Sequence, residues 1–421
     1  MLLVRPRPRA AESFRGFLLR LSTVNGLDTP ELIPADWAEE LARRAPGGGH
    51  PRGPITGYRH FARGDVGGLP SRYWNNRRPR YCPECLSENP TWLSLWELVF
   101  VTECPRHRIQ LLDSCSACAR PLRWRRPELL RCSCGASLVD TQGVASAPEP
   151  LKVSCDLDRA WNGGRPSRLD QDGVMSVEEL LQRTWFLGAY ASRSARRALK
   201  LANLFDVCSA RRIASAAYLP LEDGPLPLFA LLDQVAGHYG NATSMRLTSR
   251  FGAMYKELFD PSSKRALREV REGFELYVES RWPGQLAARN RRLSQEVRER
   301  HLWVPLTRAA RELHWKLPRL RSAVERGVVR GHITQHKSGR ISGTVHRDDL
   351  TRLLDETRNE LTLLEVCARM HLGKKAVKAL VAAGRLLPSS GPSIDQCTIW
   401  RFKRFEVERL VRLAVSEDRC S

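Results

Sequence analysis

The chain has 421 residues, of which 42% are hydrophobic, and its 68 Lys and Arg residues exceed its 46 Asp and Glu residues by 68 − 46 = 22. This apolar share excludes a disordered or fibrous chain, and the length predicts about three domains. No apolar run approaches the roughly 18 residues of a membrane span, and the N-terminal segment lacks the apolar core of a secretory signal, so we expect a cytoplasmic protein.

The excess positive charge lies in two stretches. Residues 281–421 carry 29 basic and 15 acidic residues, which is 29 − 15 = +14, and residues 52–81 carry seven Arg and one Asp, which is 7 − 1 = +6. Local positive charge predicts surfaces that neutralise nucleic-acid phosphates, although exposed arginines can also serve only to solvate a surface.

The N-terminal residues 10–45 have the apolar spacing of a helix. Phe14, Phe17, Leu18 and Leu21 fall on one face, and Asn25-Gly26 predicts the end of that helix. Residues 46–81 are rich in Gly, Pro and Arg, with aromatic residues between the arginines. They predict an irregular arm whose aromatic side chains either stack on bases or anchor the arm on its own domain.

Four short knuckles of Cys and His follow this arm, and seven of the twelve cysteines lie between Cys82 and Cys134. Each knuckle can turn two ligands toward one ion, and two knuckles complete a tetrahedral zinc site. Pairing in chain order predicts a Cys₃His site and a Cys₄ site, while cross-braced pairing of first with third and second with fourth knuckle stays open. The first predicted site is Cys82, Cys85, Cys104 and His107, and the second is Cys115, Cys118, Cys132 and Cys134.

Both predicted zinc sites are filled by protein ligands. A catalytic zinc keeps one position open for water, so we expect two structural Zn²⁺ ions that fold a stretch with little core of its own. The other cysteines are scattered and are expected to be buried hydrophobes or surface thiols.

Residues 141–175 contain several Pro and Gly residues and predict a linker. The next stretch, residues 176–300, has helical spacing throughout and predicts a central helical bundle. We place these helices at 177–187, 195–205, 226–236, 245–259 and 264–281.

A repeat becomes visible when the C-terminal region is shifted by 57 residues, because Leu313-His314 falls on Met370-His371 and Gly327 falls on Gly384 without a gap. Each copy predicts a helix, a tight turn and a second helix. Thr307 and Thr362 are the predicted N-caps, and in copy one the alternating residues of 328–333 and 341–346 predict a wing hairpin around Ser338-Gly339. The region therefore resembles a tandem winged helix-turn-helix, with modules at 303–357 and 360–415.

Basic residues of these modules are candidates for DNA contact, because cations at the start of a second helix can reach phosphates and base edges. The alternative is that the modules dock proteins. The first copy is the better candidate for base reading because it has arginines and a basic wing. The candidates are Lys316, Arg319, Arg321, Arg330, Lys337 and Arg340 in copy one and Lys374, Lys375 and Lys378 in copy two.

Catalytic motifs are not found in the sequence. It contains no GxxxxGK[ST] phosphate loop, and no acidic cluster suited to two-metal chemistry stands out. We therefore expect a protein that is not an enzyme and that depends on partners for ATP hydrolysis or strand transfer.

These motifs together resemble the TniQ/TnsD family of transposon target-site selection proteins, most specifically over residues 1–140. Ala119 departs from the family pattern, which often has Gly there, and Leu93 stands where a basic residue is common. The resemblance rests on Glu12-Ser13-Phe14, Asn25-Gly26, Tyr81-Cys82-Pro83-Glu84-Cys85-Leu86, Trp96, Thr102-Glu103-Cys104-Pro105-Arg106-His107, Leu111-Leu112, Cys115, Cys118 and Cys132-Ser133-Cys134-Gly135.

The resemblance implies a bacterial adaptor that marks a target site and recruits an AAA+ ATPase regulator, which in turn brings the transposase. Some members of the family read target DNA directly, and others act on an RNA-guided CRISPR effector complex with its guide RNA. A homodimer is left open. The alternatives are a zinc-containing tandem winged-helix transcription regulator that binds one operator, and a metal-dependent nuclease.

The predicted fold is mainly α. It comprises an N-terminal TniQ-like domain over 1–140 with zinc knuckles at 82–134, a linker over 141–175, a helical domain over 176–300 and the two helix-turn-helix modules.

Overall fold

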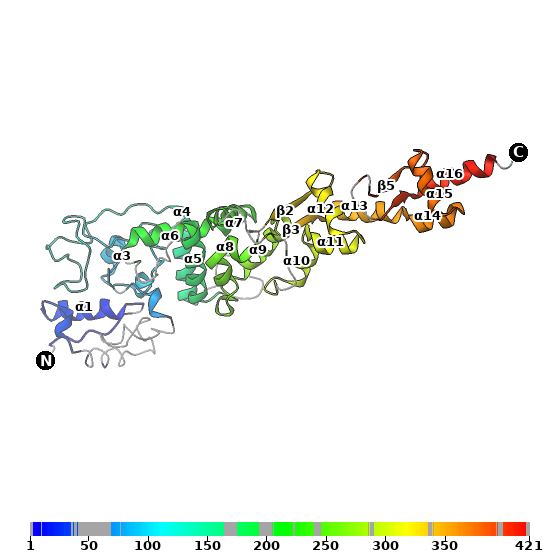
Figure 1. Ribbon diagram of the computed structural model, residues 1–421. Helices are drawn as coiled ribbons and strands as arrows, with labels where there is room; N and C mark the ends of the chain where they lie inside the picture. Colours follow the sequence, from blue (N-terminus) through cyan, green and yellow to red (C-terminus); the bar gives the residue numbers. More distant parts are fainter. Residues whose placement is uncertain are drawn as a thin grey trace. The chain divides into compact units, whose positions relative to one another are not determined.

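The structure is a computed structural model, and its elements are mainly α-helices (Figure 1). The chain divides into two compact units, Met1–Val235 with Lys256–Arg271 and Ala236–Tyr255 with Glu272–Ser421. No helix in the described part of the chain is long and apolar enough to span a membrane. The structure describes residues 3–9, 11–34, 37, 40, 69–75, 77–163, 175–192, 204, 206–221, 224–239, 246–284, 286, 290–335, 339, 341–392, 394 and 399–417.

The first helix, α1 (Phe14–Val24), confirms the predicted apolar face, because Phe14, Phe17, Leu18 and Leu21 are all buried. Ser13 caps the helix by accepting a hydrogen bond from the backbone N–H of Gly16 at 2.9 Å. The helix ends at Asn25, and the left-handed φ of +65° at Gly26 explains why the predicted Asn-Gly stop works.

A buried ion pair fixes the segment before α1. Arg20 donates two hydrogen bonds of 2.7 Å to the carboxylate of Glu12, and both residues are buried. Glu12 also accepts a hydrogen bond of 2.9 Å from the backbone N–H of Arg9. The pair therefore ties the N-terminal arm to the helix.

Replacing Glu12 with Gln is expected to lower the free energy of unfolding by about 3 kcal/mol, because Arg20 then keeps a buried charge without a counter-charge. Chemical denaturation of the variant measures this loss. The matched control is Glu128→Gln, which removes an exposed partner of Arg131 and is expected to cost less than about 0.5 kcal/mol. Equal losses in the two variants would contradict the role assigned to burial.

The predicted linker is wrong over α4 (Pro148–Trp161), which is a helix packed into the core of the first unit. Val153 and Leu157 are buried there, and the Ser154 hydroxyl accepts hydrogen bonds from the backbone N–H groups of Thr102 and Glu103, both at 3.2 Å. Pro148 lies in the first turn of the helix, where a missing N–H costs nothing. Residues 164–174 of the predicted linker lie outside the described residues.

The predicted boundary between residues 1–140 and 176–300 also differs from the structure. Leu180, Leu181 and Ile213 belong to the same apolar core as the residues around the cysteine knuckles, so the helices that carry them extend the N-terminal domain. The predicted helix at 195–205 lies almost entirely outside the described residues. The helices after α4 are α5 (Val177–Ala191), α6 (Val207–Tyr218), α7 (Leu226–Tyr239), α8 (Leu247–Leu258) and α9 (Arg268–Ser280).

The second unit has an aromatic core of its own. The ring of Phe251 on α8 lies 5.0 Å from that of Phe274 on α9 and 5.7 Å from that of Trp282. The buried imidazole of His301 contacts the carbonyl oxygens of Val278 and Gly284 at 3.1 and 2.8 Å. These contacts fix the segment after α9, which leads through α10 (Gln295–Arg300) into the repeat.

The 57-residue repeat is visible in the elements themselves. Each copy has a short strand, two helices, two further strands and a closing helix, and the strands form a three-stranded antiparallel sheet of the same order. The starts of five pairs of equivalent elements differ by 360 − 303 = 57, 363 − 306 = 57, 374 − 317 = 57, 388 − 331 = 57 and 404 − 347 = 57. The last strand of copy two is shorter than that of copy one, so their starts differ by 401 − 341 = 60 and their ends by 403 − 346 = 57. Copy one is β1 (Trp303–Pro305), α11 (Leu306–Glu312), α12 (Leu317–Glu325), β2 (Gly331–Gln335), β3 (Ile341–His346) and α13 (Arg347–Arg358). Copy two is β4 (Glu360–Thr362), α14 (Leu363–Met370), α15 (Lys374–Ala382), β5 (Pro388–Ser390), β6 (Arg401–Lys403) and α16 (Arg404–Glu417).

The turns of the two copies match as well. His314 and His371 both have a left-handed φ, of +52° and +53°, and Gly327 and Gly384 follow their helices with φ of +72° and +69°. The predicted cap at Thr362 is confirmed, since it forms a capping box with Glu365. Thr307 is not a cap, because α11 begins one residue earlier, after Pro305.

Candidate metal centres and nucleic-acid surface

The first two knuckles meet in one cluster, which could hold a metal ion. Cys82 precedes α3 (Pro83–Glu88), and its sulfur accepts a hydrogen bond from the backbone N–H of Cys85 at 3.4 Å. Cys104 and His107 lie on a tight turn closed by the same kind of bond, from His107 N–H to the Cys104 sulfur at 3.4 Å. The two turns therefore bring their four ligand atoms close together.

The third and fourth knuckles form a second cluster. The Cys115 sulfur lies 3.7 Å from that of Cys134, and the Cys118 sulfur lies 3.9 Å from that of Cys132. In each cluster all four ligand atoms lie within 4.8 Å of one another. The structure therefore groups the knuckles in chain order and not in the cross-braced arrangement.

The dimensions of both clusters fit zinc. A tetrahedron with Zn–S bonds of 2.3 Å has sulfur–sulfur edges of about 3.8 Å. The observed sulfur–sulfur distances are 3.6 Å for Cys85 to Cys104 and 3.7 and 3.9 Å in the second cluster. Four soft donors at this spacing suit Zn²⁺ better than Mg²⁺ or Ca²⁺, which prefer oxygen.

The electrostatics of the first cluster also favour a cation. Hydrogen bonding between the Cys104 and Cys82 sulfurs lowers the pKa of Cys104 to about 2 and raises the pKa of Cys82 to about 12. The contact with Cys104 likewise raises the pKa of Cys85. Adjacent thiols therefore resist ionising together, whereas a divalent cation between them would allow all three thiolates.

Glu88 is a partner of the first cluster that the sequence reasoning missed. The His107 Nδ1 atom faces the sulfurs, at 3.2 Å from Cys85 and 3.4 Å from Cys82, while its Nε2 atom lies 3.1 Å from the Glu88 carboxylate. A carboxylate that accepts the Nε2 proton leaves the Nδ1 lone pair for a metal. The one signal in the sequence is that a ligating His commonly has such a partner and that Glu88 lies on α3, three residues after Cys85.

Three knuckles are followed by residues with left-handed backbone. These are Arg108, Ala119 and Gly135, with φ of +56°, +56° and +87°. Ala119 is the position at which the resemblance leads one to expect Gly, so the backbone explains that family pattern. A residue with a Cβ atom is strained in this conformation.

Replacing Ala119 with Gly is expected to raise the free energy of unfolding by about 1 kcal/mol, because it removes this strain. Thermal unfolding in excess zinc measures the gain. The control is Ala117→Gly, two residues away and without a positive φ, where added backbone freedom is expected to lower stability by about 0.5 to 1 kcal/mol. A loss of stability at both positions would contradict the strain.

Arg80 does not belong to the phosphate-binding surface predicted for the arginines of 52–81. Its guanidinium is fully buried, and it donates to the carbonyl oxygens of Val99 and Val101 at 2.7 and 3.0 Å. Desolvation lowers the pKa of Arg80 to about 10. This arginine holds the chain between the first two knuckles, and residues 52–68 of the same stretch lie outside the described residues.

Among the predicted DNA contacts, Arg319 differs most from its predicted position. The sequence places it on an outward face of α12, but only 7% of it is exposed. Its guanidinium stacks over the Trp315 ring at 3.6 Å and lies 3.8 Å from the Glu360 carboxylate at the start of the second copy. Arg319 therefore packs inside the second unit and does not face solvent.

The other described cations of copy one have carboxylate partners or hydrogen bonds. Arg321 contacts Glu325 at 2.7 Å, and Arg330 contacts Asp349 at 3.2 Å. The hydrogen bonds from Arg330 hold the pKa of Asp349 below its usual range. Lys316 is exposed at the start of α12, while Lys337 and Arg340 lie outside the described residues.

The predicted DNA contacts of copy two differ from those of copy one. Lys374, Lys375 and Lys378 on α15 are all exposed, and among the described residues none of them has a carboxylate within ion-pair distance. Two of them lie in the first turn of the helix, where the positive end of the helix dipole disfavours cations. Such an arrangement is stable when an anion binds there.

Comparison with known proteins places the first cluster inside a family match. Residues 56–111 match the TniQ family model, and this stretch contains Cys82, Cys85, Cys104 and His107. A search of curated proteins finds no match. The second cluster and the repeat lie beyond the matched residues. The match over residues 56–111 supports membership of the TniQ family, which is associated with the selection of target sites in DNA transposition.

Proposed function

We propose that the protein is a target-site selection adaptor of a Tn-type DNA transposition system. It binds target DNA or an RNA-guided CRISPR effector complex and recruits an AAA+ ATPase regulator and, through it, the transposase. The observation that carries this proposal is the TniQ match over a preformed Cys₃His cluster. An operator-binding transcription regulator would not require this domain.

The metal clusters serve this function as structural sites. Two Zn²⁺ ions, one in each cluster, hold the chain between Tyr81 and Gly135 as a rigid surface for protein partners. All four positions around each ion are filled by Cys or His, so neither ion has an open position for a substrate. The chemistry of integration therefore belongs to the partners.

The two copies of the repeat serve as winged helix-turn-helix modules. In each, the second helix is the element that enters a DNA groove and the hairpin after it is the wing. The exposed lysines of α15 make copy two the phosphate-contacting module. This assignment revises the expectation that copy one is the better candidate for base reading, since Arg319 is buried.

The proposal is tested by affinity purification of the tagged protein from its native host, followed by mass spectrometry. The expected result is co-purification of an ATPase and a transposase, or of a CRISPR effector complex. A parallel purification of the Cys82→Ser protein serves as the control, because partners that bind the zinc-ordered surface should be lost from it. Recovery of transcription machinery alone, with no transposition or CRISPR protein, would overturn the adaptor function in favour of the regulator.

A further inference from the structure

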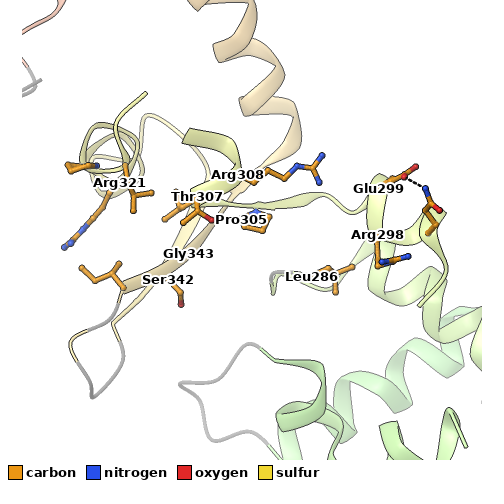
Figure 2. Close-up of a pocket in the computed structure, with 14 residues that line it drawn as sticks. Leu286, Arg298, Glu299, Pro305, Thr307, Arg308, Arg321, Ser342 and Gly343 are labelled. Carbon is orange, nitrogen blue, oxygen red and sulfur yellow. Dashed lines mark hydrogen bonds between the residues drawn. The ribbon is translucent and has the colours of Figure 1, made fainter. Parts of the chain in front are cut away.

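Copy one of the repeat contains a pocket of about 770 Å³ (Figure 2). It lies where α10, the start of α11, the start of α12 and strand β3 come together. A volume of this size is typical of sites that bind a small ligand or a few residues of a peptide.

The pocket has an aliphatic surface. Apolar side chains line it from four elements, and Leu317 at the start of α12 is 41% exposed. No aromatic ring lines the pocket among the described residues, so it offers no stacking platform for a base. An aliphatic side chain is the better occupant. The apolar lining residues are Leu286, Pro305, Leu306, Leu317, Pro318 and Ile341.

Arginines surround this aliphatic surface. Arg298, Arg308 and Arg321 line the pocket against one acidic residue, Glu299, which gives a lining charge of 3 − 1 = +2. Figure 2 shows Arg321 at the left of the view and Arg298 at the right. The guanidinium groups can bind carboxylates with two parallel hydrogen bonds.

The carboxylates that now pair with two of these arginines would compete only weakly with a ligand. Arg308 contacts Glu312 at 2.8 Å and Arg321 contacts Glu325 at 2.7 Å, both as exposed pairs one helical turn apart. Such pairs contribute about 0.3 to 0.5 kcal/mol each. An acidic ligand could therefore take over these guanidinium groups at little cost.

The second copy differs at the positions that form this pocket. With the 57-residue shift, Leu317 and Pro318 correspond to Lys374 and Lys375, and Gly343 corresponds to Trp400. The same place in copy two is therefore cationic and carries a large ring, whereas copy one keeps an open aliphatic pocket. The two copies are therefore suited to ligands of different chemistry.

We propose that the pocket of copy one binds an acidic peptide segment of a partner protein, which inserts an aliphatic side chain of Leu or Ile size between the arginines. The aliphatic lining, which includes Leu317 and Ile341, receives the aliphatic group, and Arg308 and Arg321 bind flanking carboxylates. Copy one is then a peptide-docking module, and this role goes beyond target-site selection by copy two.

The test uses the full-length zinc-loaded protein and two fluorescein-labelled peptides of equal charge, Asp-Glu-Leu-Asp-Ile-Glu-Asp and Asp-Glu-Ser-Asp-Ser-Glu-Asp. Fluorescence anisotropy is expected to show at least about tenfold tighter binding of the aliphatic peptide, because that peptide buries two apolar side chains. In Leu317→Gln/Ile341→Thr this preference is expected to vanish, since both substitutions remove apolar lining without changing charge.

Two further variants test the contribution of charge to peptide binding and the role of copy two in it. Arg308→Gln/Arg321→Gln is expected to weaken both peptides about tenfold at low salt and to keep their ratio. Lys374→Gln/Lys375→Gln should leave the ratio of the two peptide affinities unchanged, because these residues lie outside the pocket. Circular dichroism checks that each variant folds.

Three results would overturn the proposal. The first is equal affinity of the native protein for the two peptides. The second is a preference for the aliphatic peptide that survives in Leu317→Gln/Ile341→Thr. The third is that Arg308→Gln/Arg321→Gln loses affinity for duplex DNA but keeps its affinity for the peptides. The last result would assign the pocket to nucleic acid. None of them bears on the metal clusters or on recruitment of the ATPase, so this proposal can fail while the proposed function stands.

Discussion

Replacing Cys82 with Ser is expected to reduce the bound zinc from two ions per chain to one and to unfold the region around residues 80–140. The loss is large because a structural zinc contributes apparent binding free energies of about 10 to 16 kcal/mol, which matches or exceeds the total stability of a typical domain. Serine cannot replace the thiolate that completes the four-donor set with Cys85, Cys104 and His107.

The unfolding is expected to reach beyond the knuckles. Cys82 belongs to the same apolar core as Leu157 on α4, Leu180 on α5 and Ile213 on α6. Loss of the first ion therefore exposes helices that lie more than 60 residues away in the sequence. Limited proteolysis should show new cleavage in α4 to α6 as well as in the knuckles.

Metal analysis and near-ultraviolet circular dichroism measure these effects, because the buried rings of Trp92 and Trp96 lie in the same core. Cys115→Ser is expected to remove the other ion. The matched control is Cys208→Ser, an exposed cysteine outside both clusters, which should retain two ions and the native spectrum. Two ions retained in Cys82→Ser would show that the ligand assignment is wrong.

The metal clusters could be predicted almost completely from the sequence. Ligand type and spacing are local properties, and a loop of 7 residues between the second and third knuckles made pairing in chain order the simpler solution. Glu88 was harder to find, because its role depends on how α3 turns toward His107 and not on a motif. The repeat was equally accessible, since a 57-residue shift aligns both the sequence and the elements.

Helix α4 shows why the domain boundaries were not predictable. Pro148 and Pro150 suggested a linker, but proline is favoured in the first turn of a helix. The burial of Val153 and Leu157 depends on a core that also contains Trp96, Leu181 and Ile213, which are distant in the sequence. Local composition carries no information about such a partner.

Arg319 shows the same limit at the nucleic-acid surface. Helical spacing alone places it outward with Lys316, yet it is covered by Trp315 and reaches Glu360, which lies 360 − 319 = 41 residues later. The charge of a residue is readable from the sequence, but its counter-charge in the next module is not. This difference is the reason for proposing copy two, and not copy one, as the phosphate-contacting module.

Replacing Lys374, Lys375 and Lys378 together with Gln is expected to weaken binding to duplex DNA by on the order of 100-fold at about 0.1 M salt. Each lysine that neutralises a phosphate releases about 0.9 counterion, so the slope of log affinity against log salt should fall by up to about 2.7. The three side chains are exposed and have no carboxylate partner among the described residues, so glutamine should leave the fold intact.

Fluorescence anisotropy with a labelled duplex at several salt concentrations measures this slope. The matched control is Arg319→Gln, which also removes a cation from the second helix of a module but at a buried position. It is expected to lower the melting temperature and to leave the salt slope unchanged, because Arg319 faces Glu360 and not solvent. A slope that falls in Arg319→Gln and stays constant in the lysine variant would return the DNA contact to copy one and leave α15 as a protein-docking helix.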